Sequence, residues 1–255
     1  MAISGVSSVG STNYYGAIAS GSRINSAADD AAGSAIHEKF KSQEGATSAN
    51  MDNIQSGIDA LNVADGSLSS ITDYLQSIKE LSIKASNGLY TPADKKAIQD
   101  QIDQYKQGIV DSVNSSEFNT RKLIDGSFEN VSVVSNPDGS GKDISIGEAT
   151  LKALGLEDYD VTKGSDMSQV DKALDYVNSR RTKVGADTNA LQSAYNYSAG
   201  SLEALNSSDS NLADLDIPKA VSDLKKQQLL DDITIQMQRK HQEEEEQNSI
   251  TKLLP

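Results

Sequence analysis

Large aliphatic residues recur every three, four or seven positions in the first third of the chain, which places them on one face of an α-helix. This stripe consists of Ile54, Ile58, Leu61, Leu68, Ile71, Leu75, Ile78 and Leu81. A helix from about Asp30 to Asn87 would be roughly 85 Å long, far longer than most globular helices. It can bury its stripe only against other long helices, so the sequence predicts an elongated bundle.

Turn and capping residues predict both ends of this helix. Asn25 and Ser26 predict a turn, and we expect the acidic pair Asp29–Asp30 in the first helical turn, where carboxylates are favoured. Asn87–Gly88 predicts the end, because glycine readily takes the left-handed conformation that closes a helix. The segment Thr91–Asp94, Thr-Pro-Ala-Asp, is typical of a new helix start. That second helix would return antiparallel, with an apolar face of Ile98, Ile102, Tyr105, Ile109 and Val113.

The middle of the chain changes from helical to strand periodicity. Two short apolar segments flank the turn residues Asn136-Pro137-Asp138-Gly139, which predicts a β-hairpin. The apolar members are Val131 and Val133 before the turn, and Ile144 and Ile146 after it.

A third helix follows, and its repeat alternates spacings of four and three without interruption. Its members are Val170, Leu174, Val177, Arg181, Val184, Thr188, Leu191, Tyr195, Ser198, Leu202 and Leu205. The polar members Arg181, Thr188 and Ser198 make this face too weak for an isolated coiled coil and favour packing against the other two helices. The predicted fold is therefore mainly α: a rod of long antiparallel helices with a small β-hairpin region.

Composition excludes several classes of function. Lys and Arg total 23 against 37 Asp and Glu, a net charge of −14, so we expect no nucleic-acid partner and no membrane surface. The absence of Cys removes disulfides, thiol catalysis and thiolate metal sites. No run of about 18 apolar residues occurs, and the first twenty residues lack the pattern of a cleaved signal peptide. Export would need another route.

Candidate chemical sites are weak, and we expect no catalytic residue, cofactor or metal. His37–Glu38 lacks a second histidine four residues on, where Lys41 stands, so an exposed polar pair is the favoured interpretation. His241 beside Glu243 is expected to be solvated. Serines of the predicted hairpin fit turn formation better than glycosylation, and the remaining acidic pairs fit solvated surface better than catalysis; these are Ser132, Ser135, Ser140, Asp29–Asp30 and Asp231–Asp232.

Five segments together resemble bacterial flagellin, in the order in which flagellins have them. They are RINSAADDAAG from Arg23, IKELSIKASNG from Ile78, FNTRKLIDG from Phe118, VNSRRTKVGA from Val177, and QNSITKLL from Gln247. The resemblance covers most of the chain and implies a structural subunit of the flagellar filament that assembles with copies of itself. It also implies uncleaved export through the flagellar secretion channel, and hence a secreted protein located in the bacterial flagellum.

The resemblance implies a domain organisation as well. Residues 1–29 and 216–255 would form an inner terminal domain that builds the filament tube, and residues 30–215 would form the helical rod. The β region at about 119–165 leaves no room for an outer domain, so the chain resembles a minimal flagellin. Pro218 is expected to break the last helical stretch near Asp214–Asp216, at the joint between the two domains.

Partners follow from the same resemblance: flagellar cap and junction proteins, and an export chaperone that holds the last helices, about 212–254. Exposed apolar residues there would otherwise promote early assembly, and they are Leu224, Leu229, Leu230 and Ile233. The animal Toll-like receptor for flagellin is a further partner. The family's receptor surface uses an arginine, a leucine and a glutamate, which fall here at Ser77, Leu81 and Gln101, so we expect weak recognition.

Both ends depart from the usual flagellin pattern and leave alternatives open. Only about twenty residues, rich in Gly and Ser, precede Arg23. Near the other end, Arg239-Lys240-His241-Gln242 is followed by four glutamates, Glu243–Glu246, which must face water or carry counter-charges. The alternatives are a secreted flagellin-like ligand or adhesin that polymerises poorly, and a hook-filament junction protein, which the motif wording favours less.

Overall fold

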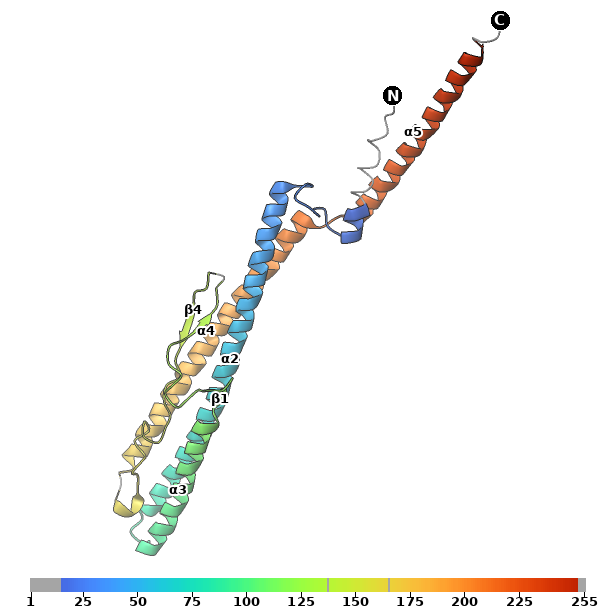
Figure 1. Cartoon of the computed structure of the whole chain (residues 1–255). Helices are drawn as coiled ribbons and strands as arrows, with labels where there is room; N and C mark the ends of the chain where they lie inside the picture. The colour runs from blue at the N-terminus through green and yellow to red at the C-terminus, as the bar shows by residue number, and fades with distance from the viewer. Residues whose placement is uncertain (1–14, 137, 165, 252–255) are drawn as a thin grey trace. The chain divides into compact units, whose positions relative to one another are not determined.

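The computed structural model describes residues 15–136, 138–164 and 166–251 (Figure 1). A short helical segment at 15–20 precedes the long helix α2, Ala31–Ala85, and its neighbour α3, Pro92–Ser115. Four short strands and a 3-10 helix, η1 (Val161–Lys163), lead to α4, Ser168–Ala213, and α5, Ile217–Thr251. The predicted mainly helical fold with a small hairpin region is confirmed.

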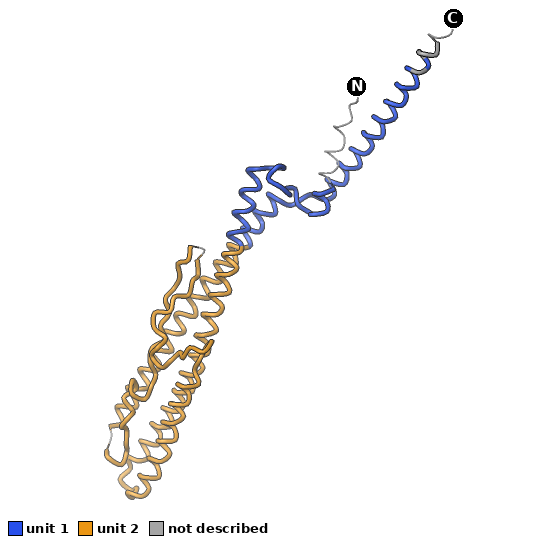
Figure 2. The backbone as a smooth tube through the Cα atoms, in the orientation of Figure 1, with its two compact units in different colours: residues 1–44, 203–255 blue, residues 45–202 orange. Residues whose placement is uncertain are grey.

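The chain divides into two compact units, which are described separately (Figure 2). The central unit comprises residues 45–202, and the terminal unit comprises residues 1–44 with 203–255. The predicted domain boundaries near 29 and 216 fall just before the starts of α2 and α5. The compact units instead divide inside two helices, α2 and α4. The domain assignment stays a prediction.

Contacts between side chains establish the packing of the central unit. Lys79 on α2 pairs with Asp171 on α4, and Gly57 on α2 lies against Leu191 on α4. Lower residue numbers on α2 therefore lie beside higher residue numbers on α4, which means that the two helices are antiparallel. The rings of Tyr74 on α2 and Tyr105 on α3 are 6.1 Å apart, between centroids. The three helices therefore pack in antiparallel neighbouring pairs, and the close approach of Tyr74 to α3 depends on the missing side chain of Gly108.

The predicted apolar stripes form one continuous core in the central unit. Its fully or almost fully buried members include Ile54, Ile58, Leu61, Leu68, Leu75, Ile102, Ile109, Val177, Val184 and Leu191. Ile98 and Leu174 are half-buried against this core. Burial of this kind is the main driving force that keeps long helices together, because their own propensity is marginal in water.

The acidic pair before α2 does not lie in the first helical turn, and that expectation is wrong. The Asp29 carboxylate accepts from the backbone N–H groups of Asn25 (3.1 Å) and Ser26 (2.9 Å) and closes the preceding turn. The Asp30 carboxylate accepts from the Gly33 N–H (2.9 Å), as a capping residue does. Both carboxylates accept hydrogen bonds from backbone N–H groups, and both residues precede α2, which begins at Ala31.

The other end of α2 also differs from the prediction. Gly88 does not have a positive φ, so no left-handed glycine closes the helix. The Asn87 side chain instead accepts from the Leu89 N–H (3.0 Å), and the Asn87 carbonyl accepts from the Tyr90 N–H (3.3 Å). The start of α3 follows the sequence prediction, since Thr91 and Asp94 form a reciprocal capping box.

The predicted hairpin is present, and a second hairpin was not foreseen. β3 (Val131–Val134) pairs antiparallel with β4 (Gly141–Ile144), with Val131 opposite Ile144. β1 (Glu117–Phe118) pairs with β2 (Arg121–Lys122) through a two-residue turn at Asn119 and Thr120. Both turn residues have positive φ, 48° and 64°, which is typical of a tight hairpin turn. The turn lacks the glycine that usually signals this geometry.

The break before α5 lies where the sequence places it. α4 ends at Ala213, and the Asp216 carboxylate accepts from the Lys219 N–H (3.1 Å) to cap α5. Pro218 lies in the first turn of α5, where its missing N–H costs no helical hydrogen bond.

Candidate assembly surfaces

The terminal unit joins two distant parts of the chain by backbone pairing. The Arg23 N–H donates to the Ala213 carbonyl (2.6 Å), and the Leu215 N–H donates to the Gly21 carbonyl (3.0 Å). The Arg23 guanidinium also donates to the carbonyl of Leu212 (2.7 Å), one of the last carbonyls of α4. The segment that begins at Arg23 therefore binds the C-terminal end of α4 through these hydrogen bonds.

A half-buried hydrogen-bonded pair lies beside this junction. His37 on α2 and Asp209 on α4 are joined at 2.5 Å, Nδ1 to Oδ1, and both side chains are largely covered. The expectation of an exposed polar His37–Glu38 pair is therefore wrong for His37, because Asp209, 172 positions away, provides a partner. Across the described ranges, no group of three or more potential metal-binding side chains occurs.

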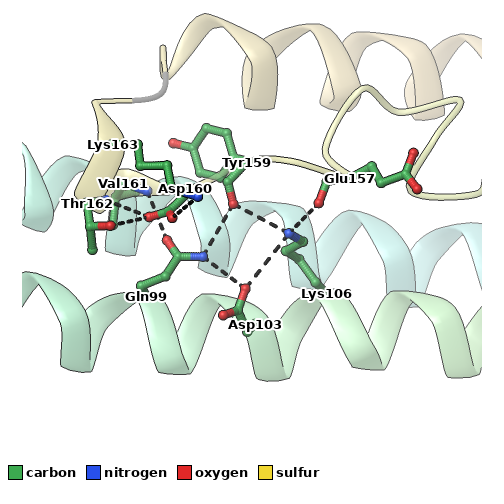
Figure 3. Close-up of polar contacts among 9 residues, drawn as sticks. All are labelled: Gln99, Asp103, Lys106, Glu157, Tyr159, Asp160, Val161, Thr162 and Lys163. Atoms are coloured by element: carbon green, nitrogen blue, oxygen red, sulfur yellow. Dashed lines mark hydrogen bonds and ion pairs between the residues drawn. The ribbon is translucent and has the colours of Figure 1, made fainter.

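A polar clamp closes one end of the central unit (Figure 3). The Gln99 amide on α3 donates to the Tyr159 carbonyl (3.3 Å), and its oxygen accepts from the Val161 N–H (2.9 Å). The Lys106 ammonium donates to the Glu157 carbonyl (2.9 Å). These bonds attach the segment before α4 to α3.

The Tyr159 side chain completes the clamp from the opposite side. Its hydroxyl donates to Ser82 Oγ on α2 (2.8 Å), and burial raises the pKa of this phenol. Sequence analysis did not single out Gln99, Tyr159 or Ser82. A single buried Gln adds nothing to an apolar repeat, and its partner lies 60 positions away in the sequence. No local pattern therefore indicates this contact.

The apolar residues predicted for the last helix divide into two groups. Leu224 is buried in the terminal unit, whereas the side chains further along α5 are exposed. Leu229 is 62% exposed, and Leu230, Ile233, Ile235 and Met237 are each close to half-exposed or more. Four of these side chains, Leu229, Leu230, Ile233 and Met237, share one face of α5, and nothing in the described chain covers them, whereas Ile235 lies on another face.

The acidic stretch lies beyond this row. Glu243, Glu244 and Glu245 are exposed. His241 is solvated as expected, since its side chain is 75% exposed, and its Nδ1 lies 3.7 Å from Glu245 Oε1. In the part of the chain that the structure describes, no helix is sufficiently long and apolar to cross a membrane.

Family models match both helical parts of the chain. The bacterial flagellin N-terminal helical region matches residues 7–129, and the C-terminal helical region matches residues 167–254. The chain is 32% identical to the flagellin of Bacillus subtilis over 254 residues, covering 84% of this chain and 83% of that protein. The chain belongs to the bacterial flagellin family. Flagellins are structural subunits of the extracellular flagellar filament, so this flagellin is a filament subunit.

Two further relatives extend the comparison. A flagellar filament core protein of Brachyspira hyodysenteriae is 32% identical over 247 residues, covering 87% of this flagellin and 85% of that protein. The crystal structure of Bacillus cereus flagellin aligns with a TM-score of 0.52 at 20% identity, over 58% of this chain and 88% of that one. The structural likeness supports the fold.

The three positions that the resemblance assigns to a receptor surface differ in accessibility in this flagellin. Ser77 on α2 is half-buried, and its hydroxyl donates to the Asp73 carbonyl (3.0 Å). Leu81 is only 9% exposed and belongs to the helical core. Gln101 on α3 is exposed. Leu81 is therefore held inside the central unit.

Proposed function

We propose that this flagellin polymerises through the exposed apolar face of α5. The observation that carries the proposal is the contrast along one helix: Leu224 is buried within the chain, whereas Leu230, Ile233 and Met237 share one face and stay exposed. Large apolar side chains grouped on a surface favour association, because their burial removes them from water. In a protein of a filament family, that surface fits contact with further subunits.

The acidic stretch of α5 sets a condition on this assembly. Exposed glutamates at 243–245 cannot be buried without counter-charges, so they must face solvent in a filament. A chain that cannot meet this condition would be the alternative, a secreted ligand or adhesin that polymerises poorly.

Reconstitution from purified monomer separates these two functions. We expect the parent chain to form filaments when seeded, and Ile233→Asp to lose this ability while its far-UV circular dichroism stays unchanged. Tyr197→Asp is the matched control, since Tyr197 is 76% exposed on α4 but lies in the central unit. A parent that remains monomeric, or an Ile233→Asp variant that polymerises normally, contradicts the proposal.

The same face of α5 suits an export chaperone before assembly. Covering Leu229, Leu230 and Ile233 in the cytosol would prevent early polymerisation. At the filament ends, cap and junction proteins would bind the surfaces through which subunits contact one another elsewhere in the filament. A pull-down tests the chaperone: a chain truncated after Ser210 should fail to retain it, and equal retention by the truncated and full chains contradicts this assignment.

Recognition by the Toll-like receptor for flagellin is proposed to be weak. Ser77 and Gln101 replace an arginine and a glutamate of the family's surface, and the burial of Leu81 leaves little of the third residue for contact. The loss of charge-assisted hydrogen bonds is the physical cause.

A further inference from the structure

The turn between α2 and α3 contains the pair Asn87–Gly88, the single Asn-Gly pair of the sequence. Both residues are exposed and lie outside the two helices. Asparagine amides are among the chemically labile groups of proteins, because the side-chain carbon Cγ is an electrophile and the next backbone nitrogen is a nucleophile. Their reaction depends on whether the fold brings the two atoms together and leaves both accessible.

The hydrogen bonds of the turn hold the electrophile in place. Asn87 Oδ1 accepts from the Leu89 N–H (3.0 Å), which makes the side-chain amide the first group of an Asx turn. This turn folds Cγ over the intervening peptide and so brings it close to the Gly88 nitrogen. The hydrogen bond from Leu89 also stabilises the negative charge that attack on Cγ would place on Oδ1. A further hydrogen bond, from the Tyr90 N–H to the Asn87 carbonyl (3.3 Å), closes the same turn.

The nucleophile and the leaving group are both free. Among the described residues, no hydrogen bond engages the Gly88 N–H or Asn87 Nδ2. A side chain at position 88 would meet no atom within 4 Å, so the space around this nitrogen is open. Glycine itself adds no side chain that would obstruct ring closure. The turn therefore offers an accessible nucleophile beside a positioned electrophile.

Two other asparagines that precede a small residue lack this combination. Asn25 lies in an exposed turn, but the Ser26 N–H donates to the Asp29 carboxylate (2.9 Å), so its nitrogen is engaged. Asn178 and Ser179 lie within α4, where each N–H donates to a carbonyl one turn earlier. The local hydrogen bonds thus distinguish Asn87 from asparagines with similar neighbours.

We propose that Asn87 is a site of spontaneous deamidation, in which the chain supplies the nucleophile and water is the only co-reactant. Hydroxide takes the proton of the Gly88 N–H, and the nitrogen forms a bond to Cγ of Asn87. The bond from Cγ to Nδ2 then breaks, and Nδ2 takes a proton from water and leaves as ammonia. The product is a cyclic imide that spans residues 87 and 88.

Water opens the imide in one of two ways. Cleavage of the bond between Cγ and the ring nitrogen gives aspartate at position 87 and restores the ordinary main chain. Cleavage at the main-chain carbonyl of residue 87 gives isoaspartate, in which the main chain runs through Cγ. The sum of the two steps converts an amide and water into a carboxylic acid and ammonia.

Either product places a carboxylate at the C-terminal end of α2. The net charge of the chain, −14, becomes more negative by one unit, at a helix end where negative charge is disfavoured. Isoaspartate also lengthens the main chain, so the Asx turn that positions Leu89 is lost. Because the filament is extracellular and the reaction needs only water, the change accumulates with the age of each subunit. The inference does not depend on polymerisation through α5.

Mass spectrometry of the aged full-length chain tests the proposal. Trypsin cleavage after Lys84 and Lys95 releases residues 85–95, in which Asn87 is the sole asparagine. This peptide should convert to aspartate and isoaspartate, faster at mildly alkaline than at neutral pH, and should gain one labelled oxygen in oxygen-18 water. The peptides with Asn25 and Asn178 are internal controls and should convert about 10–100-fold more slowly. Unaged protein digested in parallel gives the background.

Two variants separate ring closure from direct hydrolysis of the amide. Asn87→Gln keeps the amide but needs a larger ring, so its conversion should be lost. Gly88→Ala should slow conversion about tenfold while the fold is retained, because the added methyl group crowds the nucleophile but meets no neighbouring atom. Aspartate without isoaspartate indicates direct hydrolysis and overturns the inference. Conversion of Asn87 no faster than that of Asn178 in the folded chain overturns it as well.

Discussion

Arg181 on α4 and Asp65 on α2 form a bidentate salt bridge at the edge of the apolar core, with Nε–Oδ1 at 2.9 Å and Nη2–Oδ2 at 3.4 Å. The hydrogen bond to Asp65 raises the pKa of Arg181 above its usual value. Arg181 occupies a position of the heptad repeat that would otherwise be apolar. The pair therefore fixes the register of α4 on α2 through a planar fork, which an aliphatic residue could not do.

Removing this pair should cost little stability. The two side chains are 33% and 45% exposed, and exposed pairs are worth about 0.2–1 kcal/mol. A double-mutant cycle with Asp65→Ala and Arg181→Ala, followed by urea unfolding, should give a coupling energy in that range. The Lys79–Asp171 pair, of similar exposure, provides the matched cycle. A coupling energy of zero, or one several times larger, contradicts this account of the pair.

Leu191 should contribute far more than the salt bridge. Its side chain is fully buried on α4 and packs against Gly57 on α2. Leu191→Ala should therefore lower the free energy of unfolding by about 2–5 kcal/mol. Tyr197→Ala on the same helix is the control and should change stability by less than about 0.5 kcal/mol. Chemical denaturation of both variants gives the comparison. Equal midpoints for Leu191→Ala and the parent would mean that Leu191 lies outside the core under solution conditions.

The helical core could be predicted from sequence because helical burial leaves a local signal. Ile54, Leu61 and Leu191 are fully buried, and each belongs to a repeat visible within one segment. The capping box at Thr91 is equally local. Within such segments, the period of 3.6 residues and the identity of the cap determine both the helix and its buried face.

Features that depend on distant partners could not be predicted in this way. The Gln99–Tyr159 clamp and the His37–Asp209 pair join residues 60 and 172 positions apart, and neither position carries a periodic signal. The β1–β2 turn at Asn119–Thr120 lacks glycine, so its positive φ values had no sequence marker. Ser77, Leu81 and Gln101 came from family resemblance, which gives positions but not the burial of Leu81.

The capping box of α3 should make stability depend on acid pH. Hydrogen bonds from Thr91, first from its hydroxyl and then from its N–H, lower the pKa of Asp94 below its ordinary value of 3.8. Because the folded-state pKa is depressed, the stabilising effect of Asp94 is complete above about pH 4 and is lost as the pH falls through the folded-state value. Thermal unfolding from pH 7 to pH 2 measures this dependence.

Two variants separate the charge of Asp94 from its helix cap. Asp94→Asn should be less stable than the parent at pH 7 and converge with it once the pH falls below the lowered pKa of Asp94. Thr91→Val removes the hydroxyl and should shift the same loss of stability toward higher pH, because the Asp94 pKa is then less depressed. An Asp94→Asn variant whose difference from the parent does not vary with pH contradicts the assignment.

Restoring the family's receptor residues should increase innate immune signalling. Ser77 and Gln101 lie on α2 and α3, which pack antiparallel, so an arginine and a glutamate there would present opposite charges on one hairpin. Each charge-assisted hydrogen bond to a receptor is worth about 1.5–3 kcal/mol, so Ser77→Arg with Gln101→Glu should raise potency by about a hundredfold or more if the effects add. Leu81→Ala should act mainly through stability, because the side chain belongs to the core. Receptor reporter cells treated with monomer at matched concentrations give the measurement. A parent already as potent as a strong flagellin, or a double variant without gain, would show that other contacts determine recognition.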